Sequence, residues 1–171
     1  GARYRGGDFV TIYLAPRDYH RVHLPMTGQL VATTALPGEL FSVNATTART
    51  VPGLFCRNER LVCEFETAAG GMLVILVGAL IVASIETVWG GPVSPYRSRR
   101  DNNWNLTFER GAEIGRFLLG STVVMLFPSG VMQFNPDWTP GRPICMGEAM
   151  GSATSQRPVT PDLIGGLWLR G

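Results

Sequence analysis

Two histidines and one glycine–serine pair are the residues whose types and spacing could do chemistry in this sequence. His20 and His23 lie three residues apart in the stretch RDYHRVHLP, and the chain has no other histidine. Imidazole titrates near neutral pH and is the usual side chain for proton transfer there. If the stretch is extended, the two rings point to opposite sides, so one can face a site while the other supports it. The alternative is a pair of packed or surface histidines.

A metal site is a further reading of this histidine pair. It would combine His20 and His23 with a cysteine, but side chains at this spacing on a strand do not converge easily on one ion. The three cysteines are widely spaced and form no CxxC motif: Cys56, Cys63 and Cys145. We therefore expect no metal site and no disulfide framework, and the cysteine pattern suggests a reducing compartment.

The second chemical feature is the segment LLGST at 118–122, which sets small residues inside a hydrophobic strand. Such residues usually mark a bulge or a tight contact. A chemical reading is also open, because the Ser121 hydroxyl can attack the Gly120 carbonyl and turn the amide into an ester. Glycine leaves that approach unblocked, and a strained backbone and a histidine base would assist it. Elimination from the ester gives dehydroalanine, which hydrolyses to an N-terminal pyruvoyl group.

Composition limits the amine chemistry and the partners. The 15 basic residues are all arginine, so the chain has no side-chain amine to hold pyridoxal phosphate or to form a lysine Schiff base. A pyruvoyl carbonyl would supply the missing electrophile. The net charge of +2 gives no support for a nucleic-acid partner.

The elements that must position these residues are mainly short strands. Alternating or β-branched runs predict strands over 8–15, 29–36, 60–67, 72–77, 79–88 and 118–127, the last broken at 120–122, with another near 143–146. The segments 60–67 and 72–77 form a predicted hairpin, and 79–88 continues its sheet. The stretch before Pro25 is a turn or a short strand. Residues 41–50 could form a short helix capped by Ser42 or Asn44.

Two further segments allow a membrane reading. The apolar run 72–85 is too short for a transmembrane helix, which needs about 20 residues, and Gly78 interrupts it, so two buried strands are the better interpretation. Residues 90–105 are predicted as a loop in which Arg97, Arg99 and Arg100 lie between Tyr96 and Trp104. It is either an ordinary solvated loop or a contact with anionic headgroups.

The fold class expected from these elements is mainly β. With 21 glycines and 12 prolines, many turn-linked strands are favoured over a helical bundle. We expect an antiparallel sandwich or distorted barrel with one or two short helices, built as a single catalytic domain over 1–171.

Five stretches, taken in order and spacing, resemble bacterial phosphatidylserine decarboxylase proenzymes. They are FVTIYLAPRDYHRVHLP, LPGELFSVN, LFCRNERLVCEFET, ILVGALIVASIETVWGG and GAEIGRFLLGSTVVMLF, which together run from Phe9 to Phe127. The pairing of DYHRVH with a downstream LGST is the most specific part of the resemblance.

The resemblance implies a role for each matching residue. Ser121 would become the pyruvoyl group, after cleavage at Gly120–Ser121 into a β chain, 1–120, and an α chain, 121–171. His23 would be the base for self-cleavage, and His20 and Tyr13 would act in decarboxylation. The enzyme would bind phosphatidylserine at the cytoplasmic face of the cell membrane, as a peripheral protein on an anionic surface. Arg97, Arg99 and Arg100 are candidate ligands of the lipid phosphate.

The family also uses a relay aspartate in an upstream motif of the proline-alanine-aspartate-glycine type. This sequence lacks that motif, and neither Asp8 nor Asp18 matches it. We therefore expect a fragment without the family's N-terminal region. Three alternatives remain at this point: a pyruvoyl decarboxylase of a soluble amino acid, a Ser–His hydrolase using Ser121, and an inactive β-domain that binds lipid or a partner without self-cleavage.

Overall fold

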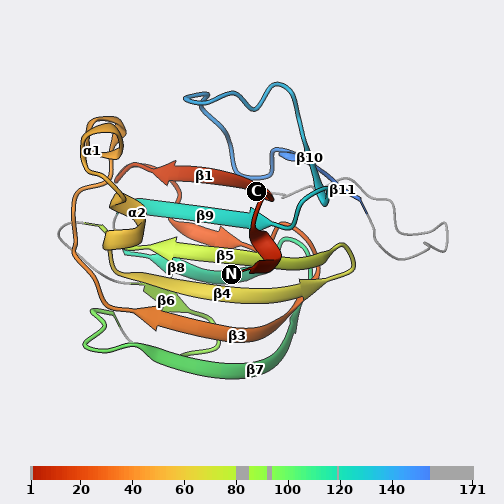
Figure 1. Ribbon diagram of the computed structural model, residues 1–171, viewed down its shortest axis with the longest axis horizontal. Coiled ribbons are helices and arrows are strands. Elements are labelled where there is room, and N and C mark those ends of the chain that lie inside the picture. The colour runs from red at the N-terminus through yellow and green to blue at the C-terminus, as the bar shows by residue number, and fades with distance from the viewer. Residues whose placement is uncertain (1, 80–84, 92–93, 119, 155–171) are drawn as a thin grey trace.

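Six antiparallel strands form the larger β-sheet of the protein (Figure 1). The computed structural model describes residues 2–79, 85–91, 94–118 and 120–154. The order across this sheet is β1 (Asp8–Leu14), β9 (Ser121–Phe127), β5 (Gly70–Val77), β4 (Arg60–Thr67), β3 (Gly28–Leu36) and β7 (Arg100–Phe108). Strand β1 therefore forms one edge and β7 the other.

A smaller sheet packs behind the first (Figure 1). Its order is β2 (Arg21–His23), β8 (Glu113–Phe117) and β6 (Ile85–Thr87). A short pair, β10 (Met132–Phe134) with β11 (Gly151–Ala153), lies beyond β9 in the chain. The described helices are short: η1 (Ala2–Tyr4), α1 (Ala45–Thr50) and α2 (Leu54–Arg57).

The core fills the space between the two sheets. In β4 every second residue is buried, so Leu61, Cys63 and Phe65 point inward while the residues between them do not. They belong to one cluster with Ile114 and Phe117 of the smaller sheet. Burying each large apolar side chain contributes about 1.5–3 kcal/mol, so this shared core holds the sheets together.

Buried polar side chains fix the end of the larger sheet at which β9 begins. The Asn58 amide donates to the carbonyls of Phe41 and Gly78, both at 2.9 Å, and its oxygen accepts from the Phe41 N–H at 3.1 Å. The Glu59 carboxylate accepts hydrogen bonds from Ser94 Oγ and the Tyr96 N–H. Because Arg60 pairs with Val77, and Val77 with Thr122, these contacts lie near the start of β9.

The predicted fold class is confirmed. The sheets are antiparallel, they pack as a sandwich, and within the described residues the larger sheet stays open between β1 and β7 and closes into no barrel. The predicted strands over 8–15, 29–36, 60–67 and 72–77 correspond to β1, β3, β4 and β5. The predicted helix is present as α1, capped by Asn44, whose side chain accepts from the N–H groups of Thr46 and Thr47.

Two strand predictions were only partly right. Of 79–88, residues 80–84 lie outside the described part, and 85–87 form β6, which belongs to the smaller sheet and does not continue the 72–77 hairpin. The predicted strand over 118–127 begins only at Ser121, and Leu118, which is 55% exposed, lies outside any strand. Of the predicted break at 120–122, Gly120 lies outside β9, whereas Ser121 and Thr122 belong to it.

Two other predictions were wrong in part or entirely. The predicted loop over 90–105 ends at Arg99, because Arg100 begins β7. Polar residues such as Asn102 are tolerated there, since an edge strand has one face open to solvent. No strand forms at 143–146, where Gly141 and Gly147 both have positive φ and the chain turns. Ile144 and Met146 line a cavity instead.

No helix in the described residues has the length and apolarity needed to cross a membrane. Residues 72–77 of the apolar segment that raised this question belong to β5, a strand with neighbours on both sides in the larger sheet.

Candidate functional site

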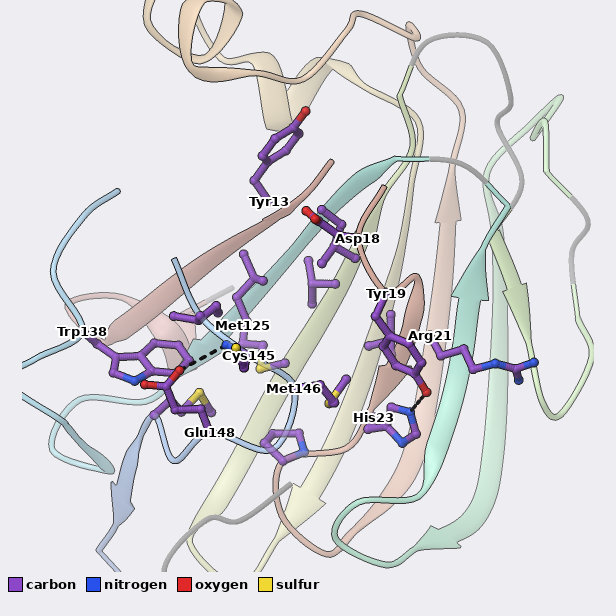
Figure 2. A pocket seen from close by; sticks show the side chains of 17 residues that line it. Tyr13, Asp18, Tyr19, Arg21, His23, Met125, Trp138, Cys145, Met146 and Glu148 are labelled. Atoms are coloured by element: carbon purple, nitrogen blue, oxygen red, sulfur yellow. Dashed lines mark hydrogen bonds between the residues drawn. The ribbon is translucent and has the colours of Figure 1, made fainter. Parts of the chain in front are cut away.

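A cavity of about 330 Å³ lies against the β1–β9 end of the larger sheet. Its walls come from β1, β2, β9 and the segment from Trp138 to Met150. Figure 2 shows Tyr19 and His23 on one side and Trp138 and Glu148 on the other. The apolar part of the wall includes Ile12, Leu14, Val22, Val123, Met125 and Trp138, and the polar part includes Asp18, Tyr19, Arg21, His23, Cys145 and Glu148.

The start of β9 lies at this cavity. Across the β1–β9 pair, Ser121 is opposite Leu14 and Val123 is opposite Ile12. Leu14, Ile12 and Val123 all line the cavity, so the Ser121 backbone lies at the end of a row of lining residues. A Cβ on Gly120 would come within 3.2 Å of both the Leu14 carbonyl oxygen and Pro16 Cδ. The chain therefore passes β1 closely at the bond between these two residues.

His23 has a defined orientation in the cavity wall. Its Nδ1 lies 2.8 Å from the Gly111 carbonyl oxygen, and its Nε2 lies 2.8 Å from the Tyr19 hydroxyl. A carbonyl only accepts hydrogen bonds, so Nδ1 carries a proton, and in the neutral ring Nε2 holds the lone pair. A β-bulge between Val22 and His23 turns the strand at this point. The ring can accept a proton at Nε2.

Tyr19 is a site residue that the sequence analysis missed. Its ring stacks on His23, with 5.7 Å between centroids and 21° between planes, in addition to the hydrogen bond. It lies within the motif DYHRVH, so a polar aromatic residue next to the histidine pair was the available signal. Gly111 is 88 residues from His23 in sequence, and nothing local predicted that contact.

His20 does not line the cavity. It precedes β2, and its backbone carbonyl accepts from the Phe117 N–H at 3.0 Å. Its Nε2 is buried and has no hydrogen-bond partner among the described residues. The Thr122 hydroxyl is likewise buried and unpartnered, and this residue directly follows Ser121. Buried polar atoms normally have partners, so these two are exceptions.

Tyr13 lies in the β1 part of the wall and is 47% exposed. Its backbone pairs with Thr122, one residue beyond Ser121. In Figure 2 it lies well apart from the Tyr19–His23 pair. Tyr13 and His23 thus line one cavity, whereas Gly120 and Ser121 are not among its lining residues; the cavity reaches Leu14, which pairs with Ser121.

The arginines of the 97–100 segment do not reach this cavity. Arg100 begins β7, and strands β3, β4 and β5 separate β7 from β9. Arg99 pairs with Asp101 at 2.9 Å, and Arg97 is exposed. The flanking aromatics point inward: Tyr96 is 7% exposed, and Trp104 donates to Thr33 Oγ1 at 2.9 Å.

The Glu148 carboxylate makes the contacts that hold the cavity-lining segment 142–148 in its conformation. Glu148 pairs with Arg142 and accepts from the Cys145 N–H at 3.1 Å. The hydrogen bond from Arg142, with that from Cys145, holds the pKa of Glu148 below its ordinary value of 4.5. These contacts close a turn that presents Ile144 and Met146 to the cavity.

The other acidic and thiol groups have separate roles. Asp18 accepts from the Ala15 N–H at 2.7 Å, and Arg21 Nη1 donates to both carboxylate oxygens of Glu113, at 2.8 and 2.7 Å. Burial raises the pKa of the Cys63 thiol, which removes it as a nucleophile at neutral pH. The described residues contain no group of three or more His, Cys, Asp and Glu side chains placed to hold a metal.

Comparison with known proteins identifies the family. The family model for phosphatidylserine decarboxylase matches residues 1–152. Phosphatidylserine decarboxylase proenzymes of Polaromonas sp., Methylibium petroleiphilum and Acidovorax ebreus are 54%, 55% and 56% identical to the chain over 159, 157 and 154 residues. The matches cover 88%, 89% and 87% of this chain.

The chain spans 56%, 56% and 54% of the length of these three relatives. The family match nevertheless includes β1, the histidine motif, the β9 start and the cavity wall through Met150. The chain belongs to the phosphatidylserine decarboxylase family.

Proposed function

We propose that the protein decarboxylates phosphatidylserine to phosphatidylethanolamine, using a pyruvoyl group made from Ser121 after self-cleavage at Gly120–Ser121. One observation supports this most directly. His23 lines the same cavity as Leu14, the residue opposite Ser121 in the β1–β9 pair. A proton-accepting imidazole and the residue paired with Ser121 therefore line one cavity, although His23 and Gly120 are 97 positions apart in sequence (120 − 23).

The residues present fit a pyruvoyl group at position 121. Glycine at 120 suits the close passage by Leu14 and Pro16, where a Cβ would be crowded. The serine begins a strand held on both sides, because β9 pairs with β1 and β5. The unpartnered Thr122 Oγ1 provides a polar atom one residue beyond the proposed new chain end.

Self-cleavage would proceed through the chain's own groups. His23 accepts the Ser121 hydroxyl proton, the oxygen attacks the Gly120 carbonyl carbon, and the C–N bond breaks to give an ester and a free amine. Elimination of the Gly120 carboxylate leaves dehydroalanine at position 121. Water then hydrolyses its imine tautomer, which releases ammonia and leaves the carbonyl. The products are the 1–120 and 121–171 chains.

The decarboxylation itself would depend on the same cavity. A pyruvoyl carbonyl captures a primary amine and takes up the electron pair released when carbon dioxide leaves. We assign His20 and Tyr13 to proton delivery and to positioning of the substrate headgroup. The apolar wall of Ile12, Leu14 and Met125 excludes water from the departing carboxylate.

We propose a peripheral location on the anionic cytoplasmic face of the cell membrane, where the substrate lipid lies. Arg97 and Arg100 are exposed at the β7 edge, away from the cavity. We assign them to general contact with headgroups of that surface and not to the phosphate of the bound substrate.

An inactive β-domain that binds lipid without cleavage is the second candidate. The observation in its favour is that His23 Nδ1 contacts the Gly111 carbonyl and no carboxylate among the described residues. Without an orienting carboxylate, histidine bases of catalytic triads lose about 10⁴-fold in rate.

Mass spectrometry of the full-length protein, its S121A variant and an S152A control separates the two candidates. We expect two chains from the wild type and from S152A, the smaller one starting with a blocked residue 121, and one intact chain from S121A. Vesicles containing phosphatidylserine should release carbon dioxide only with the cleaved proteins. Full decarboxylation by intact S121A would refute the proposal.

A further inference from the structure

Several connections of the chain meet at the end of the larger sheet where β9 begins (Figure 1). Strands β1, β5 and β3 end there, and β9, β4 and β7 start there, because Val77 pairs with both Thr122 and Arg60, and Ala35 pairs with Arg100. Helices α1 and α2 lie at the same end. We call this surface the start face and define it as residues 15–20, 37–60, 94–101 and Leu118.

Four exposed arginines of the start face form no ion pair within the described part of the chain. They are spread over the loop after β1, the helices α1 and α2, and the segment before β7: Arg17, Arg49, Arg57 and Arg97. The Arg57 guanidinium lies 4.6 Å from the centre of the Phe41 ring, a contact that leaves its charge in place. These cations are therefore open to an anion from outside the protein.

Exposed acidic residues are fewer on this face. They are Asp18, which accepts from the Ala15 N–H, Asp101, which is paired with Arg99, and Glu39. The buried Glu59 carboxylate is offset by the partly buried Arg60 that follows it. The exposed side chains therefore carry a net charge of +3 (6 − 3), because six arginines of this face are exposed: Arg17, Arg49, Arg57, Arg97, Arg99 and Arg100.

Two large apolar side chains are exposed on the same face. Leu118, which precedes Ser121 by three residues, is 55% exposed, and Tyr19 is 49% exposed. At a membrane surface, arginines bind the anionic headgroups, and aromatic or aliphatic side chains lie at the boundary between headgroups and acyl chains. The start face carries both kinds of group.

We propose that the start face is the surface that docks on an anionic lipid bilayer, with its unpaired arginines on headgroup phosphates and Leu118 at the acyl boundary. This inference rests on the proposed function, because it turns the protein so that residue 121 faces the layer that holds the substrate. The Ser121 backbone is fixed at this end by its pairing with Leu14 in β1. A lipid headgroup can therefore approach residue 121 while its acyl chains stay in the bilayer.

The first test measures binding of the uncleaved S121A protein to vesicles of phosphatidylcholine and phosphatidylglycerol, which contain no phosphatidylserine. Binding should weaken as salt rises. In this background R17Q, R49Q and R97Q should each weaken binding roughly fivefold, the contribution of one arginine near an anionic surface. R5Q is the matched control, because Arg5 is exposed and forms no ion pair among the described residues but precedes β1, at the opposite end of the sheet. It should bind like the S121A parent.

The second test reads the orientation of the bound protein. Cys56 is exposed in α2 on the start face, whereas Cys63 is buried and will not take a label. An environment-sensitive fluorophore on Cys56, in S121A protein that carries C145S, should shift its emission to the blue when the vesicles are added. The control is the same fluorophore on A68C in a C56S/C145S background, because Ala68 is exposed in the turn between β4 and β5 at the opposite end. Its emission should stay unchanged.

The outcomes separate the docking face from the proposed function. Equal weakening by R5Q and the three start-face variants overturns the docking face, because attraction would then follow total charge and not one surface. A blue shift at A68C without one at Cys56 also overturns it, as does a failure of S121A to bind these vesicles at low salt. None of these results touches the proposed function if the wild type still decarboxylates phosphatidylserine dispersed in detergent. A wild type that neither cleaves nor decarboxylates refutes the proposed function, while vesicle binding by S121A, which needs neither reaction, still decides the docking face.

Discussion

The imidazole of His23 is oriented by the backbone carbonyl of Gly111, at 2.8 Å from Nδ1. Gly111 also donates its N–H to the Leu24 carbonyl at 2.8 Å, so both of its backbone groups are bonded to the segment that carries His23. A carbonyl fixes the tautomer as a carboxylate does, but it brings no negative charge to stabilise an imidazolium. The orientation of the base thus depends on the backbone geometry at residue 111.

Gly111→Ala is the direct test of that dependence. Residue 111 has φ +83°, and a Cβ there meets no atom within 4 Å. The loss of stability in G111A should therefore come from the strained backbone conformation and not from a steric clash. Such backbone strain costs about 1–3 kcal/mol. We expect G111A to lose that much unfolding free energy in denaturant titration and to slow self-cleavage at least tenfold, because relaxation of the strain turns the carbonyl away from His23.

Gly130→Ala is the matched control for this prediction. Gly130 has φ +74°, also with nothing within 4 Å of a Cβ, and it does not contact His23. The two variants should lose similar stability while G130A keeps the wild-type cleavage rate. Equal slowing in both would show that strain alone, and not the His23 contact, controls the reaction.

We expect the buried hydroxyl of Thr122 to lower the free energy of unfolding relative to a variant that lacks it. It is fully buried in β9 with no partner among the described residues, and an unpartnered buried polar group costs about 1–3 kcal/mol. Thr122→Val keeps the shape and removes the oxygen. In the uncleaved S121A protein we expect T122V to raise the unfolding free energy by about 1 kcal/mol, measured by denaturant titration.

Thr33→Val supplies the opposite case. Thr33 is 2% exposed, and its hydroxyl accepts from Trp104 Nε1 at 2.9 Å. Removing that acceptor leaves an indole N–H without a partner, so T33V should lose about 1–2 kcal/mol. A loss of stability in T122V as well would mean that the Thr122 hydroxyl has a partner in solution.

The large strands could be predicted because their sequences alternate or remain apolar. Strand β4 buries Leu61, Cys63 and Phe65 in a strict two-residue period, and β5 is apolar without a break over residues 72–77. The three-residue strands β2 and β6 are too short to show any period. Strand β7 was missed because asparagines at the open edge of the sheet resemble a loop.

The candidate site could be predicted only where it lies in local motifs. His23 and Gly120–Ser121 carry recognisable neighbours, whereas Tyr19 and Gly111 gain their roles from contacts that folding creates. The predicted association of Arg97, Arg99 and Arg100 with the site could not be judged from sequence. Strands β5, β4 and β3 lie between β9 and β7 and so separate these arginines from the cavity. No spacing along the chain reveals that strand order.

The Glu148 carboxylate should make the cavity wall sensitive to acid. Its pKa lies below 4.5 because Arg142 and the Cys145 N–H bond the charged form. The stabilisation is therefore complete above pH 4.5 and is lost as pH falls through the lowered pKa. Hydrogen exchange of residues 142–148, corrected for intrinsic rates, should rise as pH is lowered stepwise below 4.5. E148Q should exchange quickly at every pH, and equal protection in E148Q and wild type at pH 6 would contradict this role.

Gly120→Ala tests whether the close passage by β1 serves the cleavage or only the packing. A Cβ at 120 would lie 3.2 Å from the Leu14 oxygen and from Pro16 Cδ, so the backbone at the scissile bond must shift by a few tenths of an ångström. Gly28→Ala is equally crowded, at 3.1 Å from Thr67 Cγ2 and 3.2 Å from the Glu66 oxygen, but it lies in β3. We expect similar small losses of thermal stability in both variants. Self-cleavage should fall at least tenfold in G120A alone, because small displacements of reacting atoms are costly. Cleavage of G120A at the G28A rate would assign the glycine to packing.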